Sequence, residues 1–312
     1  MNSAIRRAAL ICAQALLAIG LTNSALAQRD FSNVEIEAQD LGGGVYMLTG
    51  AGGNLGLSVG ADGAFLVDDQ YAPLTEKIVA AIREITDSPI EFVVNTHWHG
   101  DHTGGNEKLG EAGAHIVAHD NVRARLKTGL DRGEGRVTPP APPDALPVIT
   151  FAHSLTFHWN GGEVSVIHPG AQTDLPRAHT DGDAFVYFSN ANVLHMGDLL
   201  FNGGFPFIDI ASGGGLDGYI AAQELALRMI DAETKIIPGH GPLATRADLV
   251  RNLAMLREVR SRVKALIDAG RSEAEIVAAK PLADLNAEWG QGFIDAERMT
   301  QFAAQSLAKS SD

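Results

Sequence analysis

The residues with the clearest chemical potential are the six from His97 to His102, which read His-Trp-His-Gly-Asp-His. Three imidazoles and one carboxylate within six positions are nitrogen and oxygen ligands suited to a transition metal ion. His97 and His99 are two residues apart, so in extended backbone their side chains project to the same side and can converge on one ion. Gly100 allows a sharp turn before Asp101. The spacing therefore predicts a metal site with a second group of ligands beside the first.

The elements around this motif alternate between strands and helices. Residues 90–95 are apolar and β-branched, which predicts a buried strand that ends at the motif. The first half of the chain is expected to have further strands at 44–48, 55–59, 64–67 and 115–118, and helices at 74–85 and 121–130. The second half is expected to have strands at 155–159, 163–167, 184–188, 193–196 and 235–237, and a helix at 216–230.

Two halves with the same order of elements, each with one sheet, predict an α/β fold of four layers. In this αββα sandwich two sheets pack face to face and helices cover both outer sides. The sandwich is expected over residues 28–244. Residues 138–147 contain five prolines and are expected to be a surface loop or a linker between the halves.

The C-terminal residues 245–312 are expected to form a helical cap on this sandwich. Apolar side chains recur every three or four residues from Leu249 to Ile267, as on one face of a helix. Gly270 is a natural stop for that helix, and a further helix is indicated at 295–309.

Residues 1–27 have the pattern of a secretory signal peptide. An arginine pair is followed by an apolar run over residues 8–21 and by the small-x-small cleavage signal Ala25-Leu26-Ala27. The apolar run is shorter than the ~20 residues that span a bilayer, so a membrane anchor is not expected. Ile5 stands where a twin-arginine signal has Ser or Thr, which favours the general secretory route. Cleavage after Ala27 would leave a periplasmic or secreted protein.

Charge and cysteine content limit the partners. The single cysteine, Cys12, falls in the segment expected to be removed, so the mature chain has no thiol and must bind any metal through nitrogen and oxygen. Cleavage removes two of the 24 basic residues and none of the 38 acidic ones, so the net charge falls from −14 to about −16. Such an acidic chain is a poor partner for DNA, RNA or anionic lipid. We expect no nucleic-acid partner, and the oligomeric state stays open.

Three later residues lie where further strands are expected to end: His179, Asp198 and His240. Each alone is as readily a structural residue as a ligand. Together with the motif His-x-His-x-Asp-His, in this order, and with Asp68 at an earlier strand end, they resemble the metallo-β-lactamase superfamily. The resemblance covers about residues 45–242.

The resemblance implies a role for each position. One zinc ion would be held by His97, His99 and His179, a second by Asp101, His102 and His240, and Asp198 would bridge the two. Asp68 would hold the metal loop by hydrogen bonds without binding an ion. Two Zn²⁺ are expected per chain, although a site without thiolate would also accept iron or manganese.

This set of ligands implies hydrolysis by water. Neutral imidazoles and few carboxylates leave the two ions with surplus positive charge, so a bridging water would lose a proton near neutral pH and become a nucleophile. The small carbonyl substrate that this implies would be drawn to the positive charge and attacked without a serine or cysteine. Asp101 is the expected catalytic residue, because it can orient the hydroxide and pass a proton.

Departures from the known subfamilies narrow the substrate. The main β-lactamase subclass has Cys at the position of Asp198 and Lys three residues later, where this chain has Phe201. High β-lactamase efficiency is therefore not expected, and weak activity stays open. Oxygen-reducing di-iron relatives have Glu at the position of His99. Glyoxalase-II-like thioesterases share the run Gly-Asp-Leu-Leu-Phe at 197–201 and a helical C-terminal region, but their basic glutathione-binding segment has no obvious match here.

Two glycine-rich stretches are expected to form walls of the substrate cleft. They supply the candidate contacts Asn54, Asn202, Phe205 and Phe207. Equal weight goes to the alternative that the glycines serve turns and the phenylalanines belong to the core. Histidines outside the seven ligand positions are expected to be structural, and His195 alone is considered as support for a ligand.

The leading hypothesis is an exported dinuclear zinc hydrolase that attacks the carbonyl of a small ester, thioester, lactone or β-lactam. One alternative is a glyoxalase-II-like thioesterase. Another, from a different class, is a metal-binding or redox-relay accessory protein whose cluster does not hydrolyse anything. The sequence leaves the physiological substrate and the metal used in vivo open.

Overall fold

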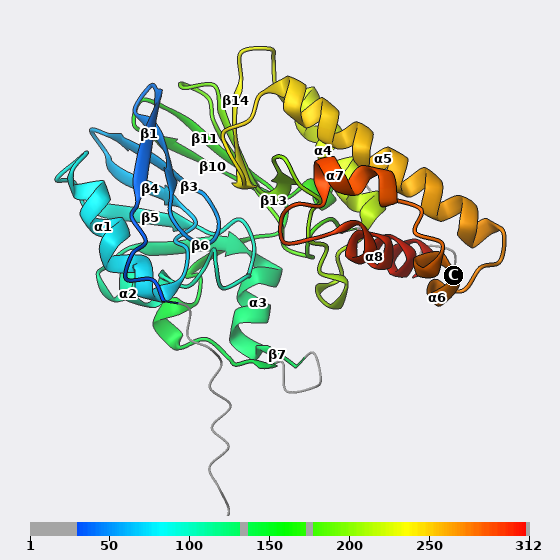
Figure 1. Ribbon diagram of the computed structural model, residues 1–312. Helices are drawn as coiled ribbons and strands as arrows, with labels where there is room; N and C mark the ends of the chain where they lie inside the picture. Colours follow the sequence, from blue (N-terminus) through cyan, green and yellow to red (C-terminus); the bar gives the residue numbers. More distant parts are fainter. Residues whose placement is uncertain (1–29, 132–136, 173–176, 310–312) are drawn as a thin grey trace, which may run out of the picture. The chain divides into compact units, whose positions relative to one another are not determined.

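Two β-sheets lie face to face in the computed structural model, and helices cover both outer sides (Figure 1). The structure describes residues 30–131, 137–172 and 177–309. Val34–Asp312 form one compact unit, to which all the elements below belong. This arrangement is the αββα sandwich, with C-terminal helices, that the sequence predicts.

The first sheet has seven strands in the order β1-β2-β3-β4-β5-β6-β9. They are β1 (Glu37–Gly42), β2 (Val45–Thr49), β3 (Leu55–Gly60), β4 (Gly63–Val67), β5 (Ile90–Val94), β6 (His115–His119) and β9 (Ile149–Phe151). Neighbours are antiparallel from β1 to β4 and parallel from β4 to β9. The carboxyl ends of β4, β5 and β6 therefore point to the same edge, where the metal motif follows β5. A separate pair is formed by β7 (Leu130–Asp131) and β8 (Val137–Thr138).

The second sheet has five strands in the order β10-β11-β12-β13-β14. They are β10 (Ser154–Trp159), β11 (Gly162–Ile167), β12 (Phe185–Phe188), β13 (Val193–Phe201) and β14 (Lys235–His240). Neighbours are antiparallel except β13 and β14, which are parallel. β13 is longer than the predicted 193–196, so Asp198 lies inside the strand and not after it.

Alternate side chains of the second sheet enter two different cores. In β12, Val186 and Phe188 join a core between the sheets that includes Phe65 of β4, whereas Phe185 joins a core shared with the helices. This is the period-two pattern of a strand that is buried on both faces. Apolar burial on both sides thus fixes the register of the strands that carry the site.

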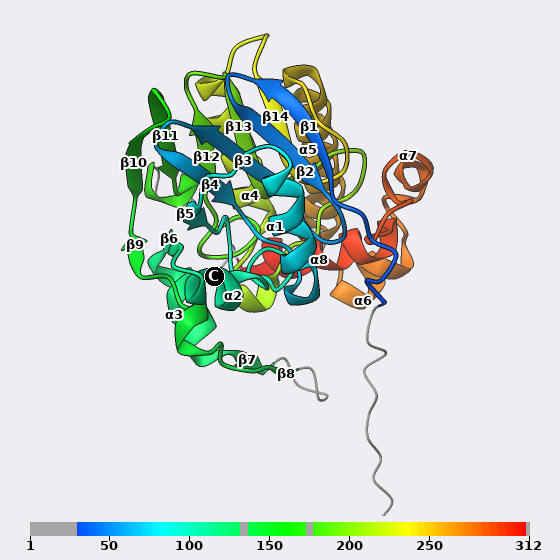
Figure 2. The same cartoon turned by 90° about the vertical axis from the view of Figure 1, so that its left-hand side faces the viewer.

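Helices form the two outer layers (Figures 1 and 2). The first sheet is covered by α1 (Thr75–Arg83), α2 (Asn106–Glu111) and α3 (Asp120–Thr128), the second by α4 (Leu216–Met229), α5 (Arg246–Asp268) and α8 (Ala296–Lys309). Two short helices, α6 (Glu273–Ala278) and α7 (Asn286–Trp289), connect α5 to α8. Single 3-10 turns lie at Ala72–Leu74, Pro143–Ala145, Pro169–Gln172, Ile210–Ser212 and Ala283–Leu285.

Local signals explain both ends of α5. Thr245 and Asp248 form a capping box at its start, in which each side chain accepts a hydrogen bond from the other residue's backbone N–H. The helix ends at Asp268, and Gly270 has a φ of +73°, a left-handed conformation that glycine adopts without strain. The stop predicted at Gly270 is confirmed.

Three features differ from the sequence-based picture or lie outside it. β1 was not predicted because most of its side chains are polar and exposed at the edge of the sheet. The proline-rich loop 138–147 precedes β9, which still belongs to the first sheet, so it is a loop within the first half and not a linker between the halves. The predicted signal peptide, residues 1–27, lies outside the described residues.

Among the residues that the structure describes, no helix combines the length and apolar character needed to cross a bilayer.

Candidate metal centre

Seven histidine and aspartate side chains from separate parts of the chain gather in two neighbouring groups. The segment after β5 supplies four of them, the loop before β12 one, β13 one and the end of β14 one. The first group is His97, His99, His179 and Asp198, and the second is Asp101, His102 and His240. All seven residues predicted as ligands are therefore brought together.

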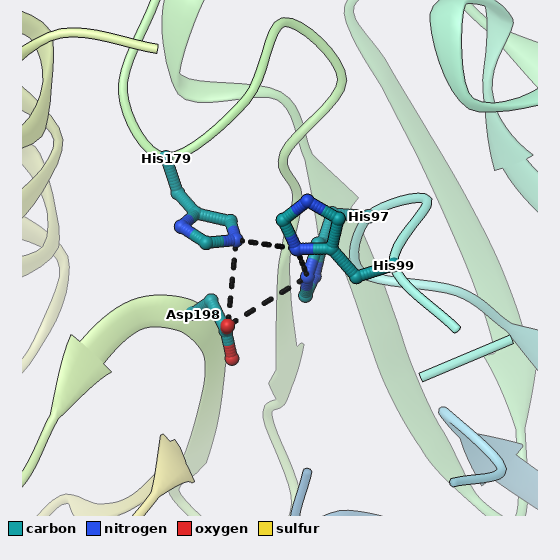
Figure 3. Close-up of side chains that lie close together, drawn as sticks. All are labelled: His97, His99, His179 and Asp198. Carbon is teal, nitrogen blue, oxygen red and sulfur yellow. Dashed lines mark hydrogen bonds and ion pairs between the residues drawn. The ribbon is translucent and has the colours of Figure 1, made fainter. Parts of the chain in front are cut away.

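In the first group three imidazole nitrogens face one point (Figure 3). The Nδ1 atom of His99 lies 3.0 Å from Nε2 of His97 and 3.0 Å from Nε2 of His179. Asp198 Oδ2 completes the group at 3.7 Å from His97 Nε2 and 3.3 Å from His179 Nε2. Ligand atoms about 2 Å from a tetrahedral zinc ion are themselves about 3.3 Å apart, so these spacings match such a site.

The second group faces the other oxygen of the same carboxylate. Asp198 Oδ1 lies 3.1 Å from His102 Nε2 and 3.3 Å from His240 Nε2. Asp101 Oδ2 lies 3.5 Å from His240 Nε2 and 3.8 Å from His102 Nε2. Asp198 thus presents one oxygen to each group.

The buried polar atoms of this cluster point to a ligand that balances them. His102 Nε2 and Asp198 Oδ1 are both buried and face each other at 3.1 Å, but neither atom makes a hydrogen bond of good geometry to any described residue. Buried polar atoms without a well-formed hydrogen bond are unfavourable, and a metal ion between them would satisfy both. The donor set of imidazole nitrogen and carboxylate oxygen is also the one that divalent zinc, iron or manganese takes. The cluster is therefore able to bind metal.

The second ring nitrogen of each buried ligand histidine is engaged elsewhere, which orients the ring. His97 Nδ1 lies 3.1 Å from Thr96 Oγ1, and His99 Nε2 lies 2.9 Å from Asp209 Oδ2. His179 Nδ1 donates to the backbone carbonyl of Phe207 at 2.8 Å.

Asp68 holds the second group from behind, as the resemblance implies. Its Oδ2 lies 2.7 Å from His102 Nδ1, and its carboxylate also accepts hydrogen bonds from the backbone N–H and the hydroxyl of Thr96, both at 2.7 Å. Asp68 has a φ of +59°, a strained backbone conformation for a residue with a side chain. Among the seven cluster residues Asp68 hydrogen-bonds to His102, and it is not placed as a metal ligand.

Two glycines allow the backbone to approach the ligands closely. A Cβ atom at Gly53 would lie 2.1 Å from His102 Cε1, and one at Gly239 would lie 2.1 Å from Asp198 Oδ1. Any larger residue at either position would displace a ligand. Gly53 therefore leaves the space that the His102 ring occupies, a role that the sequence analysis does not predict.

Burial and neighbouring charges prepare the ligands for an ion. Burial lowers the pKa of His179 to about 4 and lowers that of His97 well below its usual range, so both rings are neutral at pH 7 and keep a lone pair for metal. Burial alone would raise the pKa of Asp198, but His240 and His102, whose own pKa values are raised by nearby carboxylates, hold the pKa of Asp198 well below its usual range. The Asp198 carboxylate is therefore ionised.

The turn that carries His179 depends on Asp183, which was not singled out from the sequence. The Asp183 carboxylate accepts hydrogen bonds from the backbone N–H groups of His179 and Thr180 and from the Thr180 hydroxyl. Burial raises the pKa of Asp183 to about 7. Its place within the run His-Thr-Asp-Gly-Asp was the available signal, because Asp commonly binds backbone N–H groups in such turns.

The four candidate cleft residues have different surroundings. Phe207 is half-buried, and its ring centroid lies 5.8 Å from those of His99 and His179. Phe205 is only 2% exposed and packs in the core shared with the helices, as in the alternative that assigned it to the core.

The two asparagines make structural hydrogen bonds. The Asn54 amide donates to the carbonyls of Pro238 and Gly241, which ties the loop before β3 to the end of β14. The Asn202 amide donates to the carbonyl of Pro242.

His195 and Trp98 are both buried. His195 accepts a hydrogen bond at Nδ1 from the Gly197 N–H, and its Nε2 donates to the carbonyl of Asn54. Burial lowers the pKa of His195 to about 4, so it is a neutral structural residue that contacts no ligand directly. Trp98 packs with Val122 beneath the metal loop.

The contact of Asp209 with His99 is also not predicted from the sequence, and it leads to a testable prediction. Replacing Asp209 with Ala removes the acceptor at His99 Nε2, and zinc affinity is expected to fall about 10- to 100-fold because the ring is no longer oriented. Competition with a chromophoric chelator measures this. Asp217→Ala is the matched control, because Asp217 is a partly exposed carboxylate that pairs with Arg260 away from the cluster. Equal zinc affinity in Asp209→Ala and the wild type would contradict the role of Asp209.

Comparison with known proteins assigns the family. The model of the metallo-beta-lactamase superfamily matches residues 49–240, which run from the end of β2 to the last ligand. The fold and the His/Asp cluster described above agree with this match. The chain belongs to the metallo-beta-lactamase superfamily.

Individual relatives are more distant. A hydroxyacylglutathione hydrolase of Nitrosococcus oceani is 30% identical over 183 residues, which are 55% of this chain and 60% of that protein. A beta-lactamase-like protein 2 homolog of Caenorhabditis elegans is 27% identical over 183 residues, 57% of this chain and 52% of that protein. The matches thus span roughly half to three fifths of these relatives' lengths.

Solved structures share the fold. A metallo-beta-lactamase from Pontibacter korlensis superimposes with a TM-score of 0.58 at 21% identity, covering 72% of this chain and 99% of that one. The DIM-1 metallo-beta-lactamase gives a TM-score of 0.57 at 21% identity, covering 72% and 98%. At this level of identity the likeness concerns the fold alone.

Proposed function

We propose that the protein is a hydrolase that uses two divalent metal ions, zinc first among them, to cleave a small ester, thioester, lactone or β-lactam at its carbonyl group. The observation that carries the proposal is the position of Asp198. Its Oδ2 faces the three imidazoles of the first group, and its Oδ1 faces His102 and His240. A carboxylate shared in this way suits two ions held side by side.

Bound divalent ions supply a water molecule of lowered pKa and polarise a carbonyl oxygen. The chain's own contribution is to hold the ligands and to move a proton. Asp101 is suited to the second task because its side chain is 22% exposed while its carboxylate lies beside His240. The Gly53 N–H donates to the Asp101 backbone carbonyl at 3.1 Å, which limits the movement of this residue. Asp101 would orient the attacking water and take its proton.

The surroundings of the second group favour uncharged or thioester substrates over typical β-lactams. Phe201 stacks on His240 with ring centroids 4.8 Å apart and an interplanar angle of 24°. An aromatic ring therefore occupies the position at which the main β-lactamase subclass grips the drug's carboxylate with Lys. The hydroxyacylglutathione hydrolases among the relatives make a glyoxalase-II-like thioesterase the second candidate.

A panel of substrates tests the proposal. Zinc-loaded protein is incubated with an aryl ester, S-lactoylglutathione, a homoserine lactone and nitrocefin, and we expect turnover of at least one of the first three and weak or no turnover of nitrocefin. Metal content is measured on the same sample. If all four substrates stay intact while two zinc ions are bound per chain, the accessory-protein alternative replaces the hydrolase.

We also propose export, with cleavage after Ala27 and a periplasmic or secreted product. The support for export is the pattern of residues 1–27. The acidic composition of the rest disfavours nucleic-acid partners.

A further inference from the structure

A strip of aromatic side chains runs outward from the metal-facing histidines. Phe207 lies beside His99 and His179, with ring centroids 5.8 Å from each. The next ring along the strip is Phe293, whose centroid lies 6.3 Å from that of Phe207. Phe293 comes from the segment between α7 and α8, so the C-terminal helical region reaches the edge of the metal centre.

Phe293 is unusually exposed for its size. Its side chain is 82% exposed, the highest value among the exposed large apolar side chains of the described residues. Its neighbours are anchored: Trp289 is 4% exposed and Ile294 is 2% exposed, and both belong to the core shared with the helices. An aromatic ring that is exposed to water between two buried side chains is energetically unfavourable unless another apolar group covers it.

The segment is also fixed relative to the site. The backbone N–H of Phe205 donates to the carbonyl of Trp289 at 2.8 Å, which joins the stretch after β13 to the end of α7. Asn286 accepts from the N–H of Gly290 through its backbone carbonyl and from the N–H of Ala296 through its side chain. Figure 1 shows the connection between α7 and α8 extending toward β13.

Phe207 packs between the histidines of the first group and Phe293, the outer ring of the strip. Its carbonyl accepts from His179, and its ring packs on Phe302 of α8 with centroids 5.3 Å apart. One side of Phe207 thus belongs to the core, while its other neighbours are the metal-facing histidines and Phe293. A group bound at the metal centre and extending along Phe207 would meet Phe293 next.

We propose that Phe207 and Phe293 form an apolar subsite that takes an aryl or branched alkyl substituent of the substrate, beside its scissile carbonyl. This inference rests on the proposed function, since it assigns the substrate class of the same site. Because the strip of aromatic rings begins at the ligand histidines, a substrate held at the metal centre is the molecule expected to contact it. The protein would therefore prefer carbonyl compounds with a bulky apolar substituent over small or fully polar ones.

Equilibrium binding tests the subsite without relying on turnover. The probes are 4-fluorophenylacetate and acetate, which share a carboxylate for the metal centre and differ in the aryl group. Binding to the zinc-loaded full chain is measured by ¹⁹F NMR and by competition. The wild type is expected to bind the aryl probe about 10-fold more tightly than acetate, as one aromatic contact plus apolar burial would provide.

Phe293→Ala is expected to lower affinity for 4-fluorophenylacetate about 3- to 10-fold and to change acetate affinity less than 2-fold. Phe293→Leu should retain part of the preference because it remains apolar. Val250→Ala, which removes another exposed apolar side chain on α5, serves as the matched control.

The outcomes separate the two proposals. Equal binding of both probes to the wild type, or an unchanged ratio in Phe293→Ala, would overturn the subsite. If the substrate panel shows no hydrolysis while Phe293→Ala still loses the aryl preference, the hydrolase proposal fails and the subsite stands. If hydrolysis occurs but the ratio is unaffected, the subsite alone is wrong.

Discussion

Asp198→Asn is expected to reduce bound zinc from two ions per chain to about one and to lower hydrolysis by about 10³-fold or more. The amide has nearly the same size as the carboxylate but offers one oxygen in place of two and carries no charge. Since Asp198 presents Oδ2 to the first group and Oδ1 to the second, one of the two groups must lose the oxygen that Asp198 supplies. Elemental analysis and turnover of the best panel substrate measure both effects.

The size of this effect follows from the packing around Asp198. Its side chain is 5% exposed, so water cannot easily replace the missing ligand atom. Asp217→Asn is a suitable control, because Asp217 is a partly exposed carboxylate on α4 that pairs with Arg260 away from the cluster. Zinc content of two per chain in Asp198→Asn, with the fold intact by circular dichroism, would show that Asp198 does not bridge two ions.

Asp101→Asn is expected to keep most of the zinc and to lower kcat by about 10²- to 10³-fold. The amide oxygen can still approach the second group, but the side chain can no longer accept a proton from the attacking water. The remaining ligands of this group, His102 and His240, are unchanged. Stopped-flow turnover and elemental analysis on the same preparation separate the loss of catalysis from loss of metal.

Asp101→Glu provides the comparison for this variant, because it restores a carboxylate with altered reach. Partial recovery of kcat in Asp101→Glu would support proton transfer. Wild-type turnover in Asp101→Asn would remove Asp101 from the reaction and leave it as a ligand only.

The ligands were accessible to sequence reasoning because they occur in a fixed order along the chain, with the first four directly after a strand. His97 to His102 lie within one short segment, and His179, Asp198 and His240 follow in this order in the second half of the chain. Strands buried on both faces are recognisable from apolar composition, so the position of polar residues at their ends is informative.

The supporting residues could not be predicted in the same way. Asp209 is 110 positions from His99 in the chain, and nothing in its local sequence distinguishes it from a turn residue. Phe205 and Phe207 are two positions apart and chemically identical, yet one is in the core and the other beside the histidines. Only the three-dimensional path of the loop after β13 separates them.

The contribution of the C-terminal helices was likewise hidden. Periodicity located α5 and α8, but it says nothing about the short segment between α7 and α8. Phe293 reaches the site only because Trp289 and Ile294 bury on either side of it. Such long-range effects depend on packing and not on local propensity.

The measurement that tests the central claim most directly is anomalous diffraction at the zinc absorption edge from crystals of the zinc-loaded protein. We predict two peaks, one among His97, His99 and His179 and the other among Asp101, His102 and His240, with the carboxylate of Asp198 between them. A single peak, or peaks away from these residues, would contradict a two-ion centre bridged by Asp198.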